Sequence, residues 1–161
     1  MSEEQKKVRK CVVVLATDAH DRVVLVRNRK RKFELPGGGV EEGEDVLAAA
    51  IREFYEETGQ YLVAYPGGRV LRGTPKPGAD YDSEIYVLRG RIYQFELTGS
   101  DALADEVDGV LLASKEAVKL LHACGALSDL DSRRVLLEWA GLTDGHAVAS
   151  SFPVSDEGGG P

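Results

Sequence analysis

Three glutamates, Glu53, Glu56 and Glu57, stand close together in a stretch with helical periodicity. At about 100° per residue, their side chains fall within one arc of a helix, where like charges repel each other. Hard carboxylate oxygens with no His or Cys nearby suit Mg²⁺ or Mn²⁺, and such ions commonly bind substrate phosphates as well as protein. The alternative is a solvated acidic face, which is the commoner meaning of three glutamates taken alone.

The helix that would carry these glutamates is predicted between Asp45 and Gly59. Asp is a residue type that caps helix starts, and Gly is one that ends helices. Ala49 falls in the same arc as the glutamates and is small enough to leave them open. The residues at helical spacing on the other side are predicted to be buried: Leu47, Ala50, Ile51 and Phe54.

A glycine-rich bend, Gly37–Gly39, comes before this helix. Glycines at such a bend let the backbone approach a metal ion or a phosphate closely. The bend is neither a dinucleotide fingerprint nor a P-loop, because it lacks both the Gly-x-Gly-x-x-Gly pattern and a following Gly-Lys-Ser/Thr.

The spacing of the bend and the helix resembles the signature of the Nudix hydrolases. Two bulky-aliphatic positions of that signature differ, because Phe54 is aromatic and Gln60 is polar, but no metal or catalytic position is lost. The resemblance implies an α/β fold, the Nudix-type α/β/α sandwich with a mixed central sheet. The matching positions are Gly38, Glu44, Arg52, Glu53, Glu56, Glu57 and Gly59.

The resemblance also implies an enzyme that cleaves the pyrophosphate linkage of a nucleoside diphosphate derivative, with Mg²⁺ as cofactor and Mn²⁺ as the alternative. The three glutamates match the family's metal-binding carboxylates, and Gly38 is expected to offer its backbone carbonyl. Glu44 matches a loop glutamate that is either a metal ligand or a structural partner. Arg52 matches an arginine that holds a glutamate in place.

Two residues are candidates for the general base. Glu53 is one, and Glu106, in the loop before a predicted strand, is the other, because some relatives place a catalytic acid on such a loop. A solvated loop carboxylate is an equally good interpretation of Glu106. A base on a loop would engage only when substrate closes that loop.

Five cations lie within the six residues from Arg27 to Lys32, and four residues separate this run from the glycine bend. They form either a solvated loop, as most charge runs do, or a positive surface that steers a phosphate substrate into an acidic protein. Next to the site, we expect Arg27, Arg29, Glu34 and Gly39 to bind substrate.

The substrate class is predicted from three local resemblances to the ADP-ribose pyrophosphatase branch: Glu34-Leu35-Pro36, Pro75, and the segment 125–129. They favour ADP-ribose or a nucleotide sugar. The first alternative is a nucleoside triphosphate pyrophosphohydrolase that removes damaged nucleotides. The second is a nucleotide-sensing domain without catalysis, which the intact signature carboxylates disfavour.

The order of predicted elements indicates one domain at residues 10–140, after a flexible stretch 1–9 and before a disordered tail 141–161. The predicted strands are 11–17, 22–27, 61–64, 69–74, 84–97 and 107–113. The predicted helices are 45–59, 114–123 and 128–139, the last opened by a capping box. The long strand 84–97 is the candidate surface for pairing into a homodimer.

Composition restricts the partners and the compartment. A net charge of −7 and a pI of about 5.0 argue against nucleic acid or an anionic membrane as the main partner. No apolar run is long enough to cross a bilayer, and no signal-peptide core is present. Cys11 and Cys124 have no metal-type spacing and are expected to be buried in a reducing cytoplasm.

Overall fold

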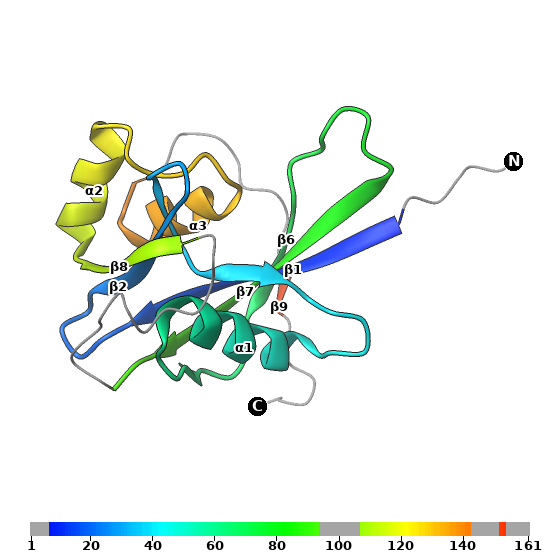
Figure 1. Cartoon of the computed structure of the whole chain (residues 1–161), viewed down its shortest axis with the longest axis horizontal. Coiled ribbons are helices and arrows are strands. Elements are labelled where there is room, and N and C mark those ends of the chain that lie inside the picture. The colour runs from blue at the N-terminus through cyan, green and yellow to red at the C-terminus, as the bar shows by residue number, and fades with distance from the viewer. Residues whose placement is uncertain (1–6, 94–106, 143–151, 154–161) are drawn as a thin grey trace, which may run out of the picture.

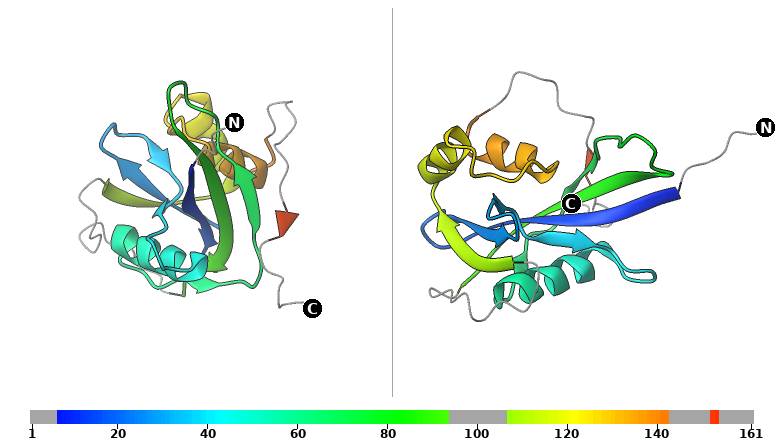
Figure 2. Two further views of the ribbon diagram at one scale, coloured as in Figure 1. Left: turned by 90° about the vertical axis from the view of Figure 1, so that its right-hand side faces the viewer. Right: turned by 45° about the horizontal axis from the view of Figure 1, so that its top comes forward.

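The computed structural model describes residues 7–93, 107–142 and 152–153. Within these ranges the chain forms one mixed sheet, with helix α1 on one face and helices α2 and α3 on the other (Figures 1 and 2). The α/β class and the predicted α/β/α sandwich are thus confirmed. None of the helices in the described ranges has the length and apolar character needed to cross a membrane.

The described residues contain nine strands and three helices. The strands are β1 (Lys7–Thr17), β2 (Val23–Asn28), β3 (Phe33–Glu34), β4 (Gly37–Gly39), β5 (Val63–Ala64), β6 (Arg69–Arg72), β7 (Tyr81–Arg91), β8 (Val107–Ala113) and β9 (Phe152–Pro153). The helices are α1 (Val46–Thr58), α2 (Lys115–Ala123) and α3 (Ser132–Trp139).

The sheet is ordered β3-β2-β1-β7-β6-β9, and the central pair β1 and β7 is parallel. The predicted hairpin of β1 with β2 is reduced to the pair Thr17↔Val23. Earlier in β1, the same edge is taken by β4, so that Gly37–Gly39 lies opposite Cys11–Val13. The glycine bend is therefore a strand of the sheet, and its pairing with β1 holds it against α1.

Strand β7 is paired on both sides, with β1 along one edge and with β5 and β6 along the other. A strand can add a partner only through a free edge. Along residues 84–91, both edges of the strand predicted to pair are therefore taken within the chain, so a second copy has no free edge to add to there.

The sheet separates two apolar cores because alternate residues of a strand face opposite sides. On β1, Val12 and Val14 pack towards α1, whereas Val13 and Leu15 pack towards α2 and α3. Phe54 of α1 is fully buried in the first core. The aromatic departure from the Nudix signature thus fills a core, as expected.

Helix α1 begins and ends where the sequence predicts. The Asp45 carboxylate accepts from the Ala48 backbone N–H at 2.7 Å, and Gly59 ends the helix in the left-handed conformation with φ 74°. The predicted buried side is wrong at Leu47 and Ile51, which are 48% and 38% exposed.

The buried face of α1 is rotated about the helix axis, towards the glutamates, relative to the face that the sequence pattern predicts. Ala49, predicted to stand open beside them, is fully buried together with Ala50, because small side chains let the helix lie close against the sheet. This rotation of the helix turns Glu57 inward, where it is only 6% exposed.

Three further predictions differ from the structure. Strand β1 starts at Lys7, because its charged residues stay exposed while their backbone pairs with β7 from Tyr81 onward. Helix α3 starts at Ser132, and its cap residue Asp131 makes no side-chain capping bond because its carboxylate accepts from Thr74 instead. Cys124 is exposed rather than buried.

Candidate active site

The centre of the site is the contact between α1 and β4. The carboxylate of Glu53 lies against the backbone of Gly38, where an added Cβ would stand 2.3 Å from the Glu53 carboxyl carbon. One turn later, Glu57 Oε1 accepts from the backbone N–H of Gly37 at 3.2 Å. A side chain at position 38 would therefore have to push the Glu53 carboxylate aside, because two predicted metal-site residues, Gly38 and Glu53, share one small space.

Arg52 joins the helix to the loop in front of it. Its guanidinium donates two hydrogen bonds to Glu44, at 2.8 and 2.9 Å, and one to the Gly39 carbonyl, at 3.1 Å. Its Nη1 atom lies 3.0 Å from Glu53 Oε2 and 3.5 Å from Glu56 Oε1. The predicted positioning role of Arg52 matches this geometry, since one side chain holds a loop and two helix glutamates together.

Glu44 was predicted to be either a metal ligand or a structural partner. In the structure both of its carboxylate oxygens accept from Arg52, and Oε1 also accepts from the Glu41 backbone N–H at 2.9 Å. The Arg52 guanidinium, with the Glu41 N–H, lowers the pKa of the Glu44 carboxyl to about 2. The described geometry therefore favours the structural role.

The donors of α1 fit a hard divalent cation by their chemistry, because all of them are oxygens. Glu53 and Glu57 flank the glycine strand, and the Glu56 side chain is 45% exposed beside them. In the arrangement shown, no three acidic, His or Cys side chains of the described residues converge on one point. Holding a metal would thus need the glutamates to turn from their present partners, Arg52 and the Gly37 N–H.

Three of the four predicted substrate-binding residues, Arg27, Arg29 and Glu34, lie around a turn that Asn28 organises. The Asn28 side-chain carbonyl accepts from the backbone N–H groups of Lys30 and Lys32, at 2.9 and 3.1 Å. Its amide nitrogen donates to Glu34 Oε1 at 2.8 Å, so Glu34 braces the turn. Sequence reasoning missed Asn28, although Asn inside a charged run is a typical signal of an Asx turn.

The basic turn, defined here as residues 27–32, is held by hydrogen bonds. Lys32 Nζ donates to the Gly125 carbonyl at 2.5 Å, and Arg31 holds a left-handed backbone with φ 66°. Arg29, Lys30 and Arg31 are exposed at its tip. Arg27, half-buried on β2, lies opposite Gly109 of β8.

Glu106, the second candidate for the general base, lies outside the described residues. The strand after it begins at Val107, whose backbone partner is Asn28 of the basic turn. Gly39 is exposed, and its carbonyl already accepts from Arg52. The structure therefore brings together Gly38, Gly39, Glu44, Arg52, Glu53 and Glu57, with Glu56 at the rim.

Comparison with known proteins identifies the family to which this arrangement of glycine strand and acidic helix belongs. The sequence profile of the NUDIX domain matches residues 7–128. The chain belongs to the Nudix family, and it is a pyrophosphohydrolase of that family.

Two groups of curated relatives are similar to the chain. Diphosphoinositol polyphosphate phosphohydrolase 3-beta of Homo sapiens is 30% identical over 159 residues, covering 93% of this chain and 90% of that protein. An RNA pyrophosphohydrolase of Dinoroseobacter shibae is 41% identical over 70 residues, which is 42% of each chain.

Solved structures share the fold at lower identity. The MutT protein from Methanosarcina mazei Go1 has a TM-score of 0.63 and 21% identity, over 86% of this chain and 96% of that chain. A Nudix hydrolase from Nitrosomonas europaea has a TM-score of 0.67 and 19% identity, over 84% of this chain and 89% of that chain.

Proposed function

We propose that this enzyme hydrolyses a phosphoanhydride bond of a small, highly phosphorylated molecule and uses Mg²⁺ as its cofactor. The observation that carries this proposal is that the basic turn leads, within a few residues of chain, into the glycine strand that contacts the acidic helix. Strand β3 follows the turn directly, and β4, which contacts Glu53 and Glu57, follows two residues later. The cations of the turn and the glycine strand at the proposed metal site thus belong to one short stretch of the chain.

The reaction needs one water molecule. Its oxygen attacks one phosphorus, the bridging P–O bond breaks, and the leaving phosphate keeps the electron pair. Glu53 is the first candidate to take the proton of the water, and Glu106 is the second. A bound Mg²⁺ would neutralise phosphate oxygens and make the water more acidic.

The chain's own residues prepare this chemistry. Glu53, Glu56 and Glu57 would hold the metal, and Arg52 acts as a positioning residue that fixes the loop against the helix. The glycine strand leaves room for a phosphate to approach the backbone.

The basic turn supports a substrate that carries many phosphates. Cations of an exposed turn attract a polyanion in proportion to its charge, and in a chain of net charge −7 they form a local positive surface. The name of the relative that matches nearly the whole chain, a diphosphoinositol polyphosphate phosphohydrolase, supports the same substrate class.

ADP-ribose or a nucleotide sugar is the second substrate class. Its support is the sequence resemblance at Glu34-Leu35-Pro36, and these residues have structural contacts in the fold. Glu34 braces the basic turn, Leu35 is buried, and the Pro36 carbonyl accepts from the Val14 N–H at 2.9 Å. The segment therefore positions the glycine strand whichever substrate binds.

A hydrolysis panel tests the proposal. Phosphate release would be measured for a diphosphoinositol polyphosphate, a 5′-triphosphorylated RNA, ADP-ribose and a nucleoside triphosphate, each with and without Mg²⁺. We expect the highest kcat/KM for the diphosphoinositol polyphosphate, and only with the metal. A preference for ADP-ribose would overturn the proposed substrate class, and turnover in the presence of a chelator would overturn the role of Mg²⁺.

A further inference from the structure

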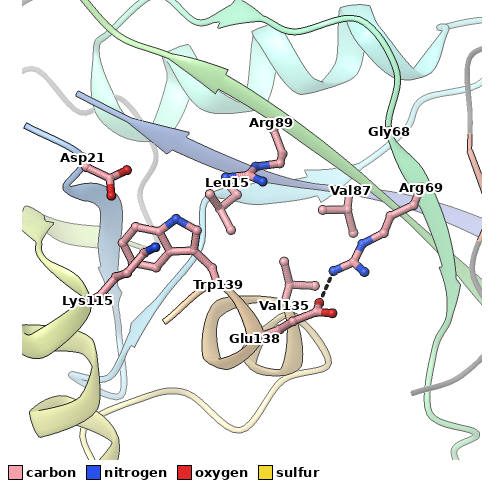
Figure 3. Close-up of a pocket in the computed structure, with 10 residues that line it drawn as sticks. All are labelled: Leu15, Asp21, Gly68, Arg69, Val87, Arg89, Lys115, Val135, Glu138 and Trp139. Atoms are coloured by element: carbon pink, nitrogen blue, oxygen red, sulfur yellow. Dashed lines mark hydrogen bonds and ion pairs between the residues drawn. The ribbon is translucent and has the colours of Figure 1, made fainter. Parts of the chain in front are cut away.

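The face of the sheet opposite α1 carries a cavity of about 570 Å³ (Figure 3). Its floor is formed by Leu15 of β1 and Val87 of β7, and its walls come from α3 and from the start of α2. Glu53 and the glycine strand belong to the other face, where α1 packs. The sheet itself therefore separates this cavity from the hydrolytic site.

One aromatic ring dominates the wall of the cavity. Trp139, at the end of α3, is half-buried, and Figure 3 shows its indole beside Leu15 and below Arg89. Lys115 Nζ lies 5.2 Å from the centroid of the ring. An indole beside apolar side chains offers a flat surface on which a planar ring can stack.

Some charged side chains around the cavity are ion-paired within the protein, and others are not. Arg69 pairs with Glu138, as the dashed line in Figure 3 shows. Within the described part of the chain, the Arg89 side chain makes no hydrogen bond or ion pair, and the only interaction of the Lys115 ammonium is with the Trp139 ring. Two cations at one cavity thus keep their donors available in a protein of net charge −7.

Asp21, in the turn between β1 and β2, lines the same cavity. Its carboxylate likewise makes no hydrogen bond or ion pair with the residues that the structure describes. A free carboxylate would repel a bare phosphate but accepts hydrogen bonds from hydroxyl groups. The cavity therefore combines a stacking surface, phosphate donors and a hydroxyl acceptor.

We propose that this cavity binds a nucleotide, with its base against Trp139, its phosphate between Arg89 and Lys115, and its sugar hydroxyls towards Asp21. The volume lies within the range of small-molecule sites. This second site is independent of the proposed hydrolytic substrate, because its residues come from the opposite face of the sheet.

Trp139 makes the test direct, because it is the only tryptophan in the chain. Its fluorescence would be followed while the intact protein is titrated with AMP, ribose 5-phosphate or inorganic phosphate. We expect a saturable change with AMP and at least tenfold weaker binding of the two probes that lack a base. Equal binding of inorganic phosphate, or no saturable change with AMP, would overturn the proposal.

Variants locate the binding. Arg89→Gln should weaken AMP binding about tenfold, since it removes a charge-assisted donor. Lys119→Gln, which removes an exposed charge one turn further along α2, should leave the Kd unchanged. Glu53→Gln should leave it unchanged as well. An AMP signal that survives Arg89→Gln, or one that Glu53→Gln abolishes, would place the ligand elsewhere and contradict the proposal.

Discussion

At the scale of single residues, the site depends on the tight contact of Gly38 with Glu53. The backbone φ of Gly38 is not in the left-handed region, and an added side chain would meet the Glu53 carboxylate. Arg52 then fixes the same carboxylate from the other side, at 3.0 Å. If Glu53 is the general base, as proposed, a small displacement at this contact moves the group that takes the proton.

Gly38→Ala tests this contact. The new methyl group would displace the Glu53 carboxylate, so we expect kcat to fall about 100-fold, the order of effect that a displacement of about 1 Å produces. Gly39→Ala is the matched control for folding, because a Cβ at that position meets nothing within 4 Å. Steady-state kinetics and thermal unfolding of both variants make the comparison. Full activity of the Gly38 variant would show that the contact is not needed.

The ion pair of Glu44 with Arg52 predicts a dependence of stability on pH. The folded-state pKa of Glu44 is about 2, below the ordinary glutamate value of about 4.3, so the folded state favours the charged form. The stabilisation is present above pH ~4.3 and is lost as the pH falls towards 2. Glu44→Gln should therefore remove part of the acid destabilisation in that window. Urea unfolding at a series of pH values measures it, and identical pH profiles for both proteins would contradict it.

At the scale of elements, α1 shows what a sequence pattern can and cannot predict. Its two ends follow from local chemistry, the Asp45 cap and the left-handed Gly59, and both were predicted. Its rotation depends on what lies opposite. Because Ala49 and Ala50 allow the closest approach to the sheet, the longer Leu47 and Ile51 are left at the flank. Hydrophobicity alone could not reveal this preference for small residues.

The basic turn is a second case at this scale. Its charges were visible in the sequence, but the bonds that shape it come from Asn28 and from the distant Gly125. A partner 93 residues away along the chain cannot be read from local spacing. For this reason, the sequence alone could not exclude a solvated loop at residues 27–32.

The double variant Lys30→Gln, Arg31→Gln tests the function of the turn. Both side chains are exposed at its tip, so the fold should be kept. We expect KM for a diphosphoinositol polyphosphate to rise about tenfold and KM for ADP-ribose to change about twofold, because attraction scales with substrate charge.

A matched control removes two exposed cations away from the turn, Arg72→Gln with Lys119→Gln. It should change neither KM appreciably. Equal effects of the two double variants would mean that only net charge matters and that the turn does not contact substrate.

At the scale of the whole molecule, the sheet has helices packed on both of its faces (Figure 2). The glycine strand pairs with β1 and packs against α1, whereas α2 and α3 enclose the cavity at Trp139 on the other face. The sandwich was predicted from the signature and the order of elements. The parallel pairing of β1 with β7 and the cavity were not, because both depend on contacts between segments that lie far apart in the sequence.

The central claim is that the glutamates of α1 hold the divalent cation at a phosphoanhydride bond. The most direct test compares Mg²⁺-dependent turnover of the wild type with that of Glu53→Gln and Glu57→Gln, alongside thermal unfolding of each. We expect kcat to fall at least 1,000-fold in both variants while the unfolding temperature stays within a few degrees, because removing a group that acts in the transition state affects rate rather than folding. Turnover retained with an unchanged Mg²⁺ dependence would contradict the account.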